Sequence, residues 1–424
     1  MIQKVFRTSI FLLCFLTLLF CASCARIEKS ESAEAVTEEQ TKKTENKKKL
    51  SVPDPLTWDE IHAIPVASPD MSVDELRQIC VDYFRLQLSY QWTPSESFDY
   101  TIASHGTNVR VKSGTVYGGH LYVTNAVSNL YRMMNYYDEE TGVFTIPSKN
   151  GDNSANLIGN QCSYGSFWGW ARVSNSITHT LTNTITPQSG IVPIGPYKST
   201  ESKTLHNTAE ICKENGMQVM YRSYAEFLPA DGMVTHNGAG HVRMVSEKAH
   251  VEYLEDGSID GAKSYVRYLD QGSSFSYRSQ GGKSVMVQGG LDLKTTFEQM
   301  YHSGYLPFTL KEFTGADPVE KGSVTVTKGA ISESMTLKEL TSLEISANYT
   351  ISDVTVKFTD ENGKILYENI AGTGELYCYE LPLRKVIFSN SIKKAVMDQK
   401  GILAVNCRLG TGESFPIYEG AVEF

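Results

Sequence analysis

Residues 159–177 read GNQCSYGSFWGWARVSNSI, and this stretch decides how the rest of the chain is interpreted. A turn-prone Gly-Asn-Gln precedes Cys162. Apolar side chains then recur near helical spacing, at Phe167, Trp170, Ala171 and Val173. The pattern predicts a helix that begins at Cys162, where the helix dipole and unpaired N–H groups favour a thiolate and can hold an oxyanion. Cys162 is therefore a candidate nucleophile; the alternative is a buried apolar residue, the usual fate of a lone Cys.

A second segment with chemical potential lies downstream, at residues 227–247, FLPADGMVTHNGAGHVRMVSE. Its Gly-rich approach reaches His241, and an alternating run follows, which predicts that His241 starts a strand and faces a cleft. A lone His is more often a surface residue. A Cys at a helix start followed by a His at a strand start is, however, the order found in papain-like cysteine hydrolases, in which the two residues meet in space. The coincidence favours His241 as a catalytic base.

The two segments resemble those of NlpC-type and CHAP-domain cell-wall hydrolases. GNQCSYGSFWGWARV is similar to their Cys segment, and LPADGMVTHNGAGHVRMV to their Pro-Gly-Asp and Gly-His-Val segments, with Ala230 in place of the Gly. GGHLYV at 118–123 resembles the NlpC Gly-x-Pro-Tyr element, with Leu121 in place of the Pro, and implies that Tyr122 lies near the catalytic Cys. The resemblance covers residues 110–275. It implies a papain-like fold and a Cys–His pair that acts on amide bonds of peptidoglycan or a similar peptide.

The third catalytic residue should hold the other ring nitrogen of the His base. Four candidates follow His241 in the sequence: His250, Glu252, Asp270 and Gln271. A second β-rich run, SYVRYLDQ at 264–271, should return beside the His strand and bring its end near the His. The CHAP-like pattern, an acidic residue followed by a polar one, also implies Asp270, whereas the NlpC-type pattern implies His250. The alternative for Asp270 is a strand end in solvent.

These considerations predict a Cys162–His241–Asp270 triad. Three further residues are expected to bind the substrate or the oxyanion: Tyr122, Gln161 and Gln271. No metal or other cofactor is expected, because His236 and His241 share one loop without an acidic or Cys ligand at a recognisable spacing.

The first residues have the layout of a secretory signal. Two basic residues precede an apolar run at 10–20, which is too short to span a membrane, and the small pair Ala-Ser directly precedes Cys24. This layout resembles the signal of bacterial lipoproteins, with Cys21 where that family usually has Leu. The resemblance implies removal of residues 1–23 and lipidation of Cys24, which would anchor the protein to the outer face of the cell membrane. The alternative is a plain signal peptide cut after a small residue.

The exported chain would be acidic and would hold an odd number of cysteines. Loss of the two basic signal residues would change the formal charge from −9 to −11, which argues against an electrostatic interaction with nucleic acid. Five cysteines follow the lipidation site: Cys80, Cys162, Cys212, Cys378 and Cys407. In an oxidising compartment at least one of these thiols has no partner within the chain.

Composition divides the remainder into three parts. Residues 24–55 are rich in Glu, Lys, Ser and Thr and predict a disordered tether. Residues 56–320 are expected to form the α+β papain-like domain, which opens with a helix at 72–88 that has a Ser-x-x-Glu capping box. Residues 321–424 are expected to form a β-sandwich. Its β-rich segments lie at 354–358, 364–370, 375–381 and 403–409, with an Asn-Gly turn between the first two.

Two functions fit this organisation. The first is a monomeric cell-surface cysteine peptidase or amidase that acts on peptidoglycan peptides through a thioester at Cys162. The second is a non-catalytic surface lipoprotein that binds glycan or peptide through aromatic side chains, at Trp168, Trp170, Tyr117 and Tyr122. The sequence favours the first function, because intact Cys and His segments would be unexpected in a protein that binds a glycan or peptide without catalysis.

Overall fold

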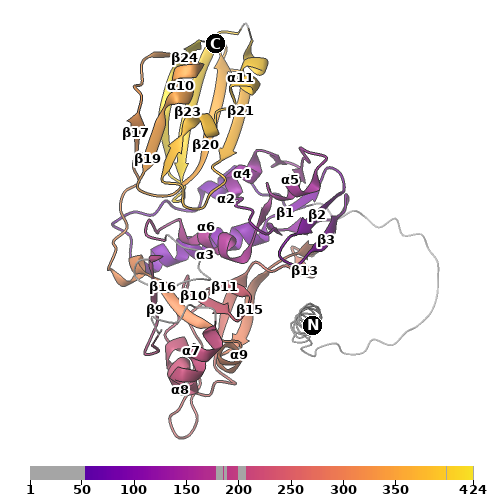
Figure 1. Ribbon diagram of the computed structural model, residues 1–424. Coiled ribbons are helices and arrows are strands. Elements are labelled where there is room, and N and C mark those ends of the chain that lie inside the picture. Colours follow the sequence, from indigo (N-terminus) through magenta and orange to yellow (C-terminus); the bar gives the residue numbers. More distant parts are fainter. Residues whose placement is uncertain (1–52, 178–184, 186–188, 199–206, 398, 424) are drawn as a thin grey trace, which may run out of the picture. The chain divides into compact units, whose positions relative to one another are not determined.

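The computed structural model describes residues 53–177, 185, 189–198, 207–397 and 399–423 (Figure 1). These residues form a mixed α+β structure with several sheets, which confirms the expected class. The expected signal peptide, the lipidation site at Cys24 and nearly all of the tether lie outside the described residues. Within the described ranges, no helix has the length and apolar character needed to cross a membrane.

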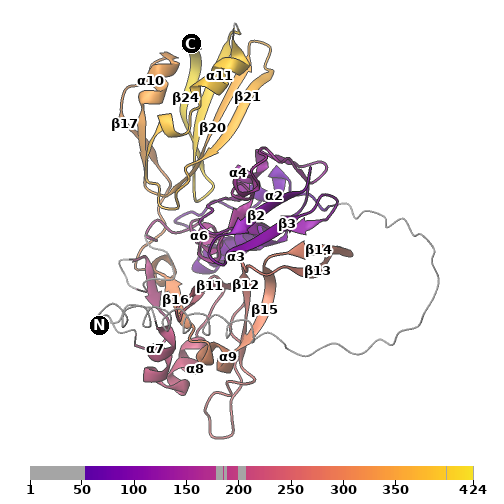
Figure 2. The same ribbon diagram turned by 45° about the vertical axis from the view of Figure 1, so that its right-hand side comes forward.

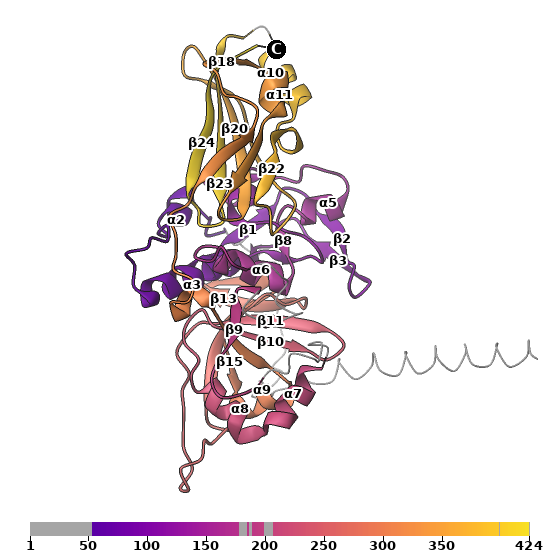
Figure 3. The same ribbon diagram turned by 60° about the vertical axis from the view of Figure 1, so that its left-hand side comes forward.

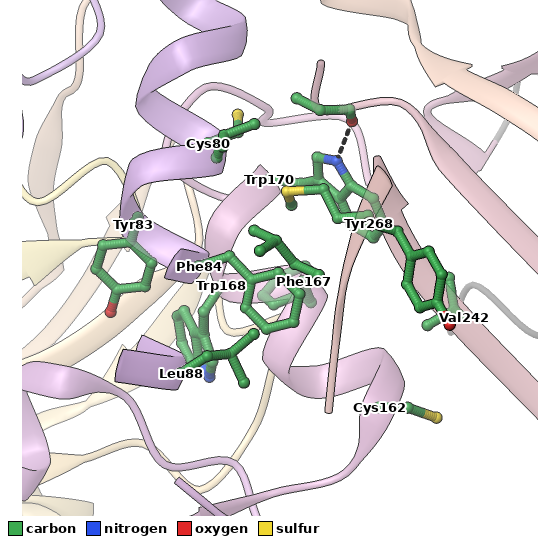
Figure 4. Close-up of a cluster of buried hydrophobic side chains, with 14 of the residues drawn as sticks. Cys80, Tyr83, Phe84, Leu88, Cys162, Phe167, Trp168, Trp170, Val242 and Tyr268 are labelled. Atoms are coloured by element: carbon green, nitrogen blue, oxygen red, sulfur yellow. Dashed lines mark hydrogen bonds between the residues drawn. The ribbon is translucent and has the colours of Figure 1, made fainter. Parts of the chain in front are cut away.

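Helix α3 (Val73–Ser89) confirms the first predicted helix. The Ser72 side chain accepts a hydrogen bond from the Glu75 N–H, and the Glu75 carboxylate accepts one from the Ser72 N–H at 2.8 Å, so the capping box is complete. Its apolar side chains recur at helical spacing and are buried: Leu76, Ile79, Cys80, Tyr83, Phe84 and Leu88. This face packs against helix α6 (Cys162–Trp170) (Figure 4).

Helix α6 begins at Cys162, as predicted, and is buried almost throughout. The Trp170 indole N–H donates to the Ala230 carbonyl at 2.7 Å, drawn as the dashed line in Figure 4. Ala230 has φ +65°, a left-handed conformation that favours glycine. Figure 4 shows the Cys162 side chain at the start of the helix, directed away from the hydrophobic cluster. The packing therefore fixes where the thiol lies.

The sheet beside α6 has the strand order β15-β12-β11-β10-β16-β9, and its neighbours are antiparallel. The strands are β9 (Ile191–Pro193), β10 (Gly232–His236), β11 (Gly240–Val245), β12 (Tyr265–Asp270), β15 (Gly290–Thr296) and β16 (Leu306–Leu310). Helices α7 (Thr208–Asn215), α8 (Met217–Tyr224) and α9 (Phe297–His302) gather at the part of the sheet away from α3 and α6 (Figures 1 and 3). Helix α6 packs on β11, and β12 returns antiparallel to β11, as predicted.

A second sheet has the order β13-β14-β4-β1-β7-β6 and joins early and late parts of the chain. Its strands are β1 (Gln91–Pro94), β4 (Tyr117–Gly118), β6 (Tyr137–Asp138), β7 (Val143–Phe144), β13 (Ser276–Gln280) and β14 (Lys283–Val287). Nearby is the hairpin of β2 (Phe98–Ile102) and β3 (Thr107–Val111) (Figure 2). Strands β5 (Leu121–Tyr122) and β8 (Gly159–Asn160) form a separate parallel pair. The short helices are α2 (Trp58–His62), α4 (Leu130–Met134) and α5 (Gly151–Ala155).

Two further sheets follow residue 320, in the orders β17-β19-β22 and β18-β24-β23-β20-β21. The first has β17 (Val324–Lys328), β19 (Glu344–Ala347) and β22 (Glu380–Pro382), and the second has β18 (Ser334–Thr336), β20 (Ile351–Asp360), β21 (Ile365–Gly372), β23 (Gly401–Leu409) and β24 (Ser414–Glu423). Helices α10 (Leu337–Ser342) and α11 (Ser389–Val396) accompany them. Three of the four predicted strands and the Asn-Gly turn are confirmed, with Gly363 at φ +82°. The segment 375–381 was expected to be a strand throughout, but only its last two residues are.

These C-terminal sheets bury a hydrophobic cluster of their own. They also contact the preceding part of the chain. The Tyr379 hydroxyl donates to the Asn175 carbonyl at 3.3 Å, and the Arg408 guanidinium lies 4.0 Å from the centre of the Tyr131 ring. A boundary near residue 320 stays a prediction. The thiols of Cys378 and Cys407 are both buried and unpaired.

A buried ion pair ties α3 to the turn before β10. Arg77 Nη1 lies 2.7 Å from Asp231 Oδ1, and both side chains are almost fully buried. The same nitrogen donates to the Pro229 carbonyl at 2.7 Å, and the guanidinium stacks over the Phe313 ring. Removal of one partner would therefore leave an uncompensated charge in the interior.

We expect Arg77→Met to lower the free energy of unfolding by about 3–5 kcal/mol, because Asp231 would lose its counter-ion. The matched control is Arg85→Met on the same helix, since Arg85 forms a half-exposed pair with Asp292 at 2.9 Å. Arg85→Met should lower the free energy of unfolding by less than about 1 kcal/mol. Urea denaturation followed by circular dichroism measures both. Equal losses in the two variants would contradict a special role for the buried pair.

Candidate active site

Cys162 lies at the open N-terminal end of α6. The N–H groups of Tyr164 and Gly165 both donate to the Gln161 carbonyl, at 3.2 and 2.9 Å. The N–H groups of Cys162 and Ser163 precede them and are directed out of the helix end, where an intrahelical partner is lacking. This end of the helix can therefore stabilise a thiolate, or an oxyanion formed next to it.

His241 and Asp270 form the second half of the site. His241 Nε2 lies 2.8 Å from Asp270 Oδ1, and this contact leaves Nδ1 for the thiol of Cys162. The pairing of β12 with β15 shifts register between Tyr268 and Asp270, and such an irregularity changes the direction of a side chain. The three residues predicted from the sequence as a triad are thus brought together, in the order thiol, imidazole and carboxylate.

The charges in the site are coupled. Burial acts to raise the pKa of the Cys162 thiol, but the hydrogen bond and positive charge of His241 lower it below its ordinary value. Burial acts to lower the pKa of His241, but Asp270 and then Cys162 raise it to about 10. A lowered thiol pKa beside a raised imidazole pKa favours the thiolate–imidazolium form of the pair. A nucleophile and a proton donor are therefore present together.

The three expected substrate-binding or oxyanion residues have different positions. Tyr122 pairs with Asn160 across β5 and β8, and its hydroxyl lies within hydrogen-bonding reach of the Cys162 sulfur. Gln161 is the residue before the helix, is partly exposed, and its amide donates to the Ser163 hydroxyl at 3.3 Å. Both remain candidates for substrate or oxyanion contacts.

Gln271 is held in the interior by backbone carbonyls. It is fully buried, and its amide nitrogen donates to the carbonyls of His120 and Gln288, at 3.0 and 2.8 Å. We correct the expectation for Gln271 accordingly: its side chain links two backbone segments and is not available to a substrate or an oxyanion.

The other candidates for the third residue lie elsewhere. His250 Nε2 is 2.9 Å from Glu252 Oε1, and both side chains are about half exposed. The two side chains pair with each other, so neither is the partner of His241.

Arg243 is a residue of the site that the sequence reasoning missed. Its Nε lies 3.3 Å from Asp270 Oδ2, while His241 contacts the other oxygen of the same carboxylate. The guanidinium also stacks over two rings, Tyr268 at 4.4 Å and Tyr305 at 5.0 Å. Arg243 therefore holds the carboxylate in place from the side opposite the imidazole. The signal was present in the sequence, because residues two apart on a strand share a face and Arg243 follows His241 by two.

Comparison of the chain with family models, with curated proteins and with solved structures gives no match. The likeness to NlpC-type and CHAP-domain hydrolases stays a prediction from the motifs. Among the described residues, no group of three or more His, Cys, Asp or Glu side chains is arranged to hold a metal ion.

The first test of the site is the reactivity of its thiol. Burial raises the pKa of the Cys378 and Cys212 thiols to about 11 and about 12, and also raises those of Cys80 and Cys407. Only Cys162 has a lowered pKa among the five described cysteines, so we expect iodoacetamide at neutral pH to alkylate it first. Peptide mapping by mass spectrometry gives the order. Labelling of all five at one rate would contradict an activated thiol.

The second test concerns Arg243. Burial acts to raise the pKa of Asp270, but the charges of His241 and then Arg243 lower it. Without Arg243 the carboxylate should protonate at a higher pH and cease to stabilise the imidazolium. In Arg243→Met we therefore expect the acid limb of the kcat/KM profile to move to higher pH, with recovery in Arg243→Lys. Arg77→Met serves as the control, because it removes a buried charge without contact to Asp270. If the acid limb of Arg243→Met does not move, Arg243 contributes only to packing.

Proposed function

We propose that this protein is a cell-surface cysteine peptidase or amidase that cleaves amide bonds of peptidoglycan peptides or similar peptides. The observation that carries the proposal is the position of the His241 ring, between the Cys162 thiol and the Asp270 carboxylate. A lowered thiol pKa beside an oriented imidazole is the arrangement that nucleophilic catalysis requires.

The geometry supports a two-step reaction. The Cys162 thiolate attacks the amide carbonyl, and the resulting oxyanion takes hydrogen bonds from the N–H groups at the start of α6. The His241 imidazolium then gives its proton to the leaving amine as the C–N bond breaks, which leaves a thioester on the sulfur. In the second step the neutral imidazole takes a proton from water, and the hydroxide attacks the thioester and releases the carboxylic acid.

The finer features of the fold belong to the same proposal. A Cys-bearing helix packed on an antiparallel sheet that supplies the His and the Asp is compatible with a papain-like domain. The two C-terminal sheets, with a core of their own, are compatible with a β-sandwich. An exported lipoprotein anchored through Cys24 would reach cell-wall peptides outside the membrane.

The binding-only alternative depended on aromatic side chains at the surface. The side chains of three of these residues are at most 2% exposed: Trp168, Trp170 and Tyr117. The indole N–H of Trp170 donates a hydrogen bond to a backbone carbonyl. These rings form part of the core, so they do not provide a surface for a glycan. Tyr122 is the exception, and it lies beside the thiol. The geometry therefore favours catalysis.

The proposed activity is tested by incubation of the purified protein with peptidoglycan, followed by mass spectrometry of the soluble fraction. We expect peptide fragments with the wild type and with Cys378→Ala, the control for loss of a thiol outside the site. We expect none with Cys162→Ala. Equal release by Cys162→Ala would refute the proposal.

A further inference from the structure

A cavity of about 460 Å³ lies between the β2–β3 hairpin and the segment 273–275 that follows β12. Its volume is large enough for a ligand group, since pockets of a few hundred cubic ångströms are typical of small-molecule sites. The hairpin and β13 that follows this segment are both visible in Figure 2. None of the residues assigned to the triad lines this cavity.

One wall of the cavity is tied to the strand that carries Tyr122. The Ser104 N–H, in the turn of the hairpin, donates to the Thr124 hydroxyl at 3.2 Å. The ring of His105, which lines the cavity, lies 6.5 Å from the ring of Tyr122, centre to centre. The hydroxyl of Tyr122 in turn reaches the Cys162 sulfur. Tyr122 is thus a neighbour both of a lining residue, His105, and of the thiol.

The other wall begins close to the triad. Ser273 follows Asp270 by three residues, a length of chain that spans at most about 11 Å. Gln288 joins the two walls, because its side-chain oxygen accepts from the Tyr122 N–H at 2.9 Å and its amide donates to the Ser273 carbonyl at 2.8 Å. Both walls of the cavity are therefore tied to the segment that carries Tyr122, the neighbour of the thiol.

The chemistry of the lining favours an anion. It includes the Arg110 guanidinium, the His105 imidazole and the Asn108 amide, with the hydroxyls of Ser273 and Ser274, and none of the described residues that line it is acidic. This contrasts with the negative formal charge of the chain. Arg110 contacts Asp99 through Nη1 at 2.5 Å, at an exposed position. A guanidinium has five N–H donors in a fork that matches a carboxylate, so the other donors remain for a ligand.

We infer that this cavity is a substrate subsite that binds a carboxylate of the peptide whose amide bond Cys162 attacks, with Arg110 as the residue that selects it. The inference rests on the proposed function. The protein then binds acidic peptides more tightly than their amidated forms. Asp99 competes with the substrate carboxylate for Arg110 and weakens that interaction.

The test uses binding, so that it does not depend on turnover. The full chain with Cys162→Ala is titrated by calorimetry with a peptidoglycan stem peptide and with the same peptide after amidation of its carboxylates. We expect the acidic peptide to bind about tenfold more tightly. Addition of Arg110→Gln should remove this difference by weakening the binding of the acidic peptide alone. Asp99→Asn should instead strengthen the binding of the acidic peptide. Lys112→Gln, a cation after β3 outside the lining, should change neither affinity.

Two outcomes would overturn the subsite: an equal effect of Arg110→Gln on both peptides, or no binding of either peptide. Neither outcome bears on fragment release from peptidoglycan by the wild type. Conversely, selective binding of the acidic peptide together with absence of any cleavage would refute the proposed function and leave the subsite intact.

Discussion

Replacement of His241 by alanine is expected to lower turnover by about 10⁴-fold or more. The imidazole supplies the proton for the leaving amine, and its charge and hydrogen bond are what lower the pKa of Cys162. Without the ring, burial and the Asp270 charge raise the thiol pKa against only the hydrogen bond from the Val242 N–H, so the pKa of Cys162 should rise above its ordinary value. The variant should therefore lose the fast alkylation of Cys162 together with its activity. Both are measured on the same preparation, by kcat/KM and by iodoacetamide labelling.

The matched control for this change is His302→Ala, at the exposed end of α9. It should leave turnover and labelling at wild-type values, and near-ultraviolet circular dichroism should show both variants folded. A folded His241→Ala protein that keeps wild-type turnover would exclude the imidazole from the reaction.

Asp270→Ala should lower turnover by about a hundredfold or more and leave the fold intact. The carboxylate contacts His241 Nε2 at 2.8 Å and is the leading cause of the raised imidazole pKa. Without it, the pKa of His241 should fall, so the alkaline limb of the pH profile, set by loss of the imidazolium proton, should move to lower pH. The profile separates this effect from a general loss of stability.

His250→Ala serves as the comparison, because this ring pairs with Glu252 and lies outside the site. We expect little change in turnover and an unmoved alkaline limb. If the two variants behaved in the reverse order, the triad would have to be assigned to His250.

The parts of the site that the sequence predicted are those set by local rules. Cys162 begins a helix because a turn-prone Gly-Asn-Gln precedes it and helical apolar spacing follows. His241 lies in a strand because an alternating run follows a glycine-rich turn, and Asp270 lies opposite because consecutive antiparallel strands pair. The capping box at Ser72 is equally local.

The parts that escaped prediction depend on packing across the sheet and between segments. Asp270 and Gln271 were both candidates, and only their hydrogen-bond partners in the folded chain, His241 for Asp270 and backbone carbonyls for Gln271, decide between them. The role of Arg243 requires the register of β11 against β12, which brings its guanidinium to the carboxylate. Aromatic residues in a short segment such as α6 are more often core than binding platform, and only the positions of α3 and β11 assign these to the core. The subsite beside Tyr122 combines two segments separated by more than a hundred residues.

Attack of the Cys162 sulfur on an amide carbonyl leaves an acyl group on the protein, so the intact mass of the protein during turnover reveals whether the attack takes place. The protein is mixed with peptidoglycan stem peptides, stopped in acid within the first turnovers, and analysed by mass spectrometry with mapping of the modified residue. We predict a peptide acyl group on Cys162 that hydroxylamine removes, and none on Cys162→Ala. Release of fragments by a wild-type protein that never carries the adduct, or an adduct that persists in Cys162→Ala, would contradict the claim.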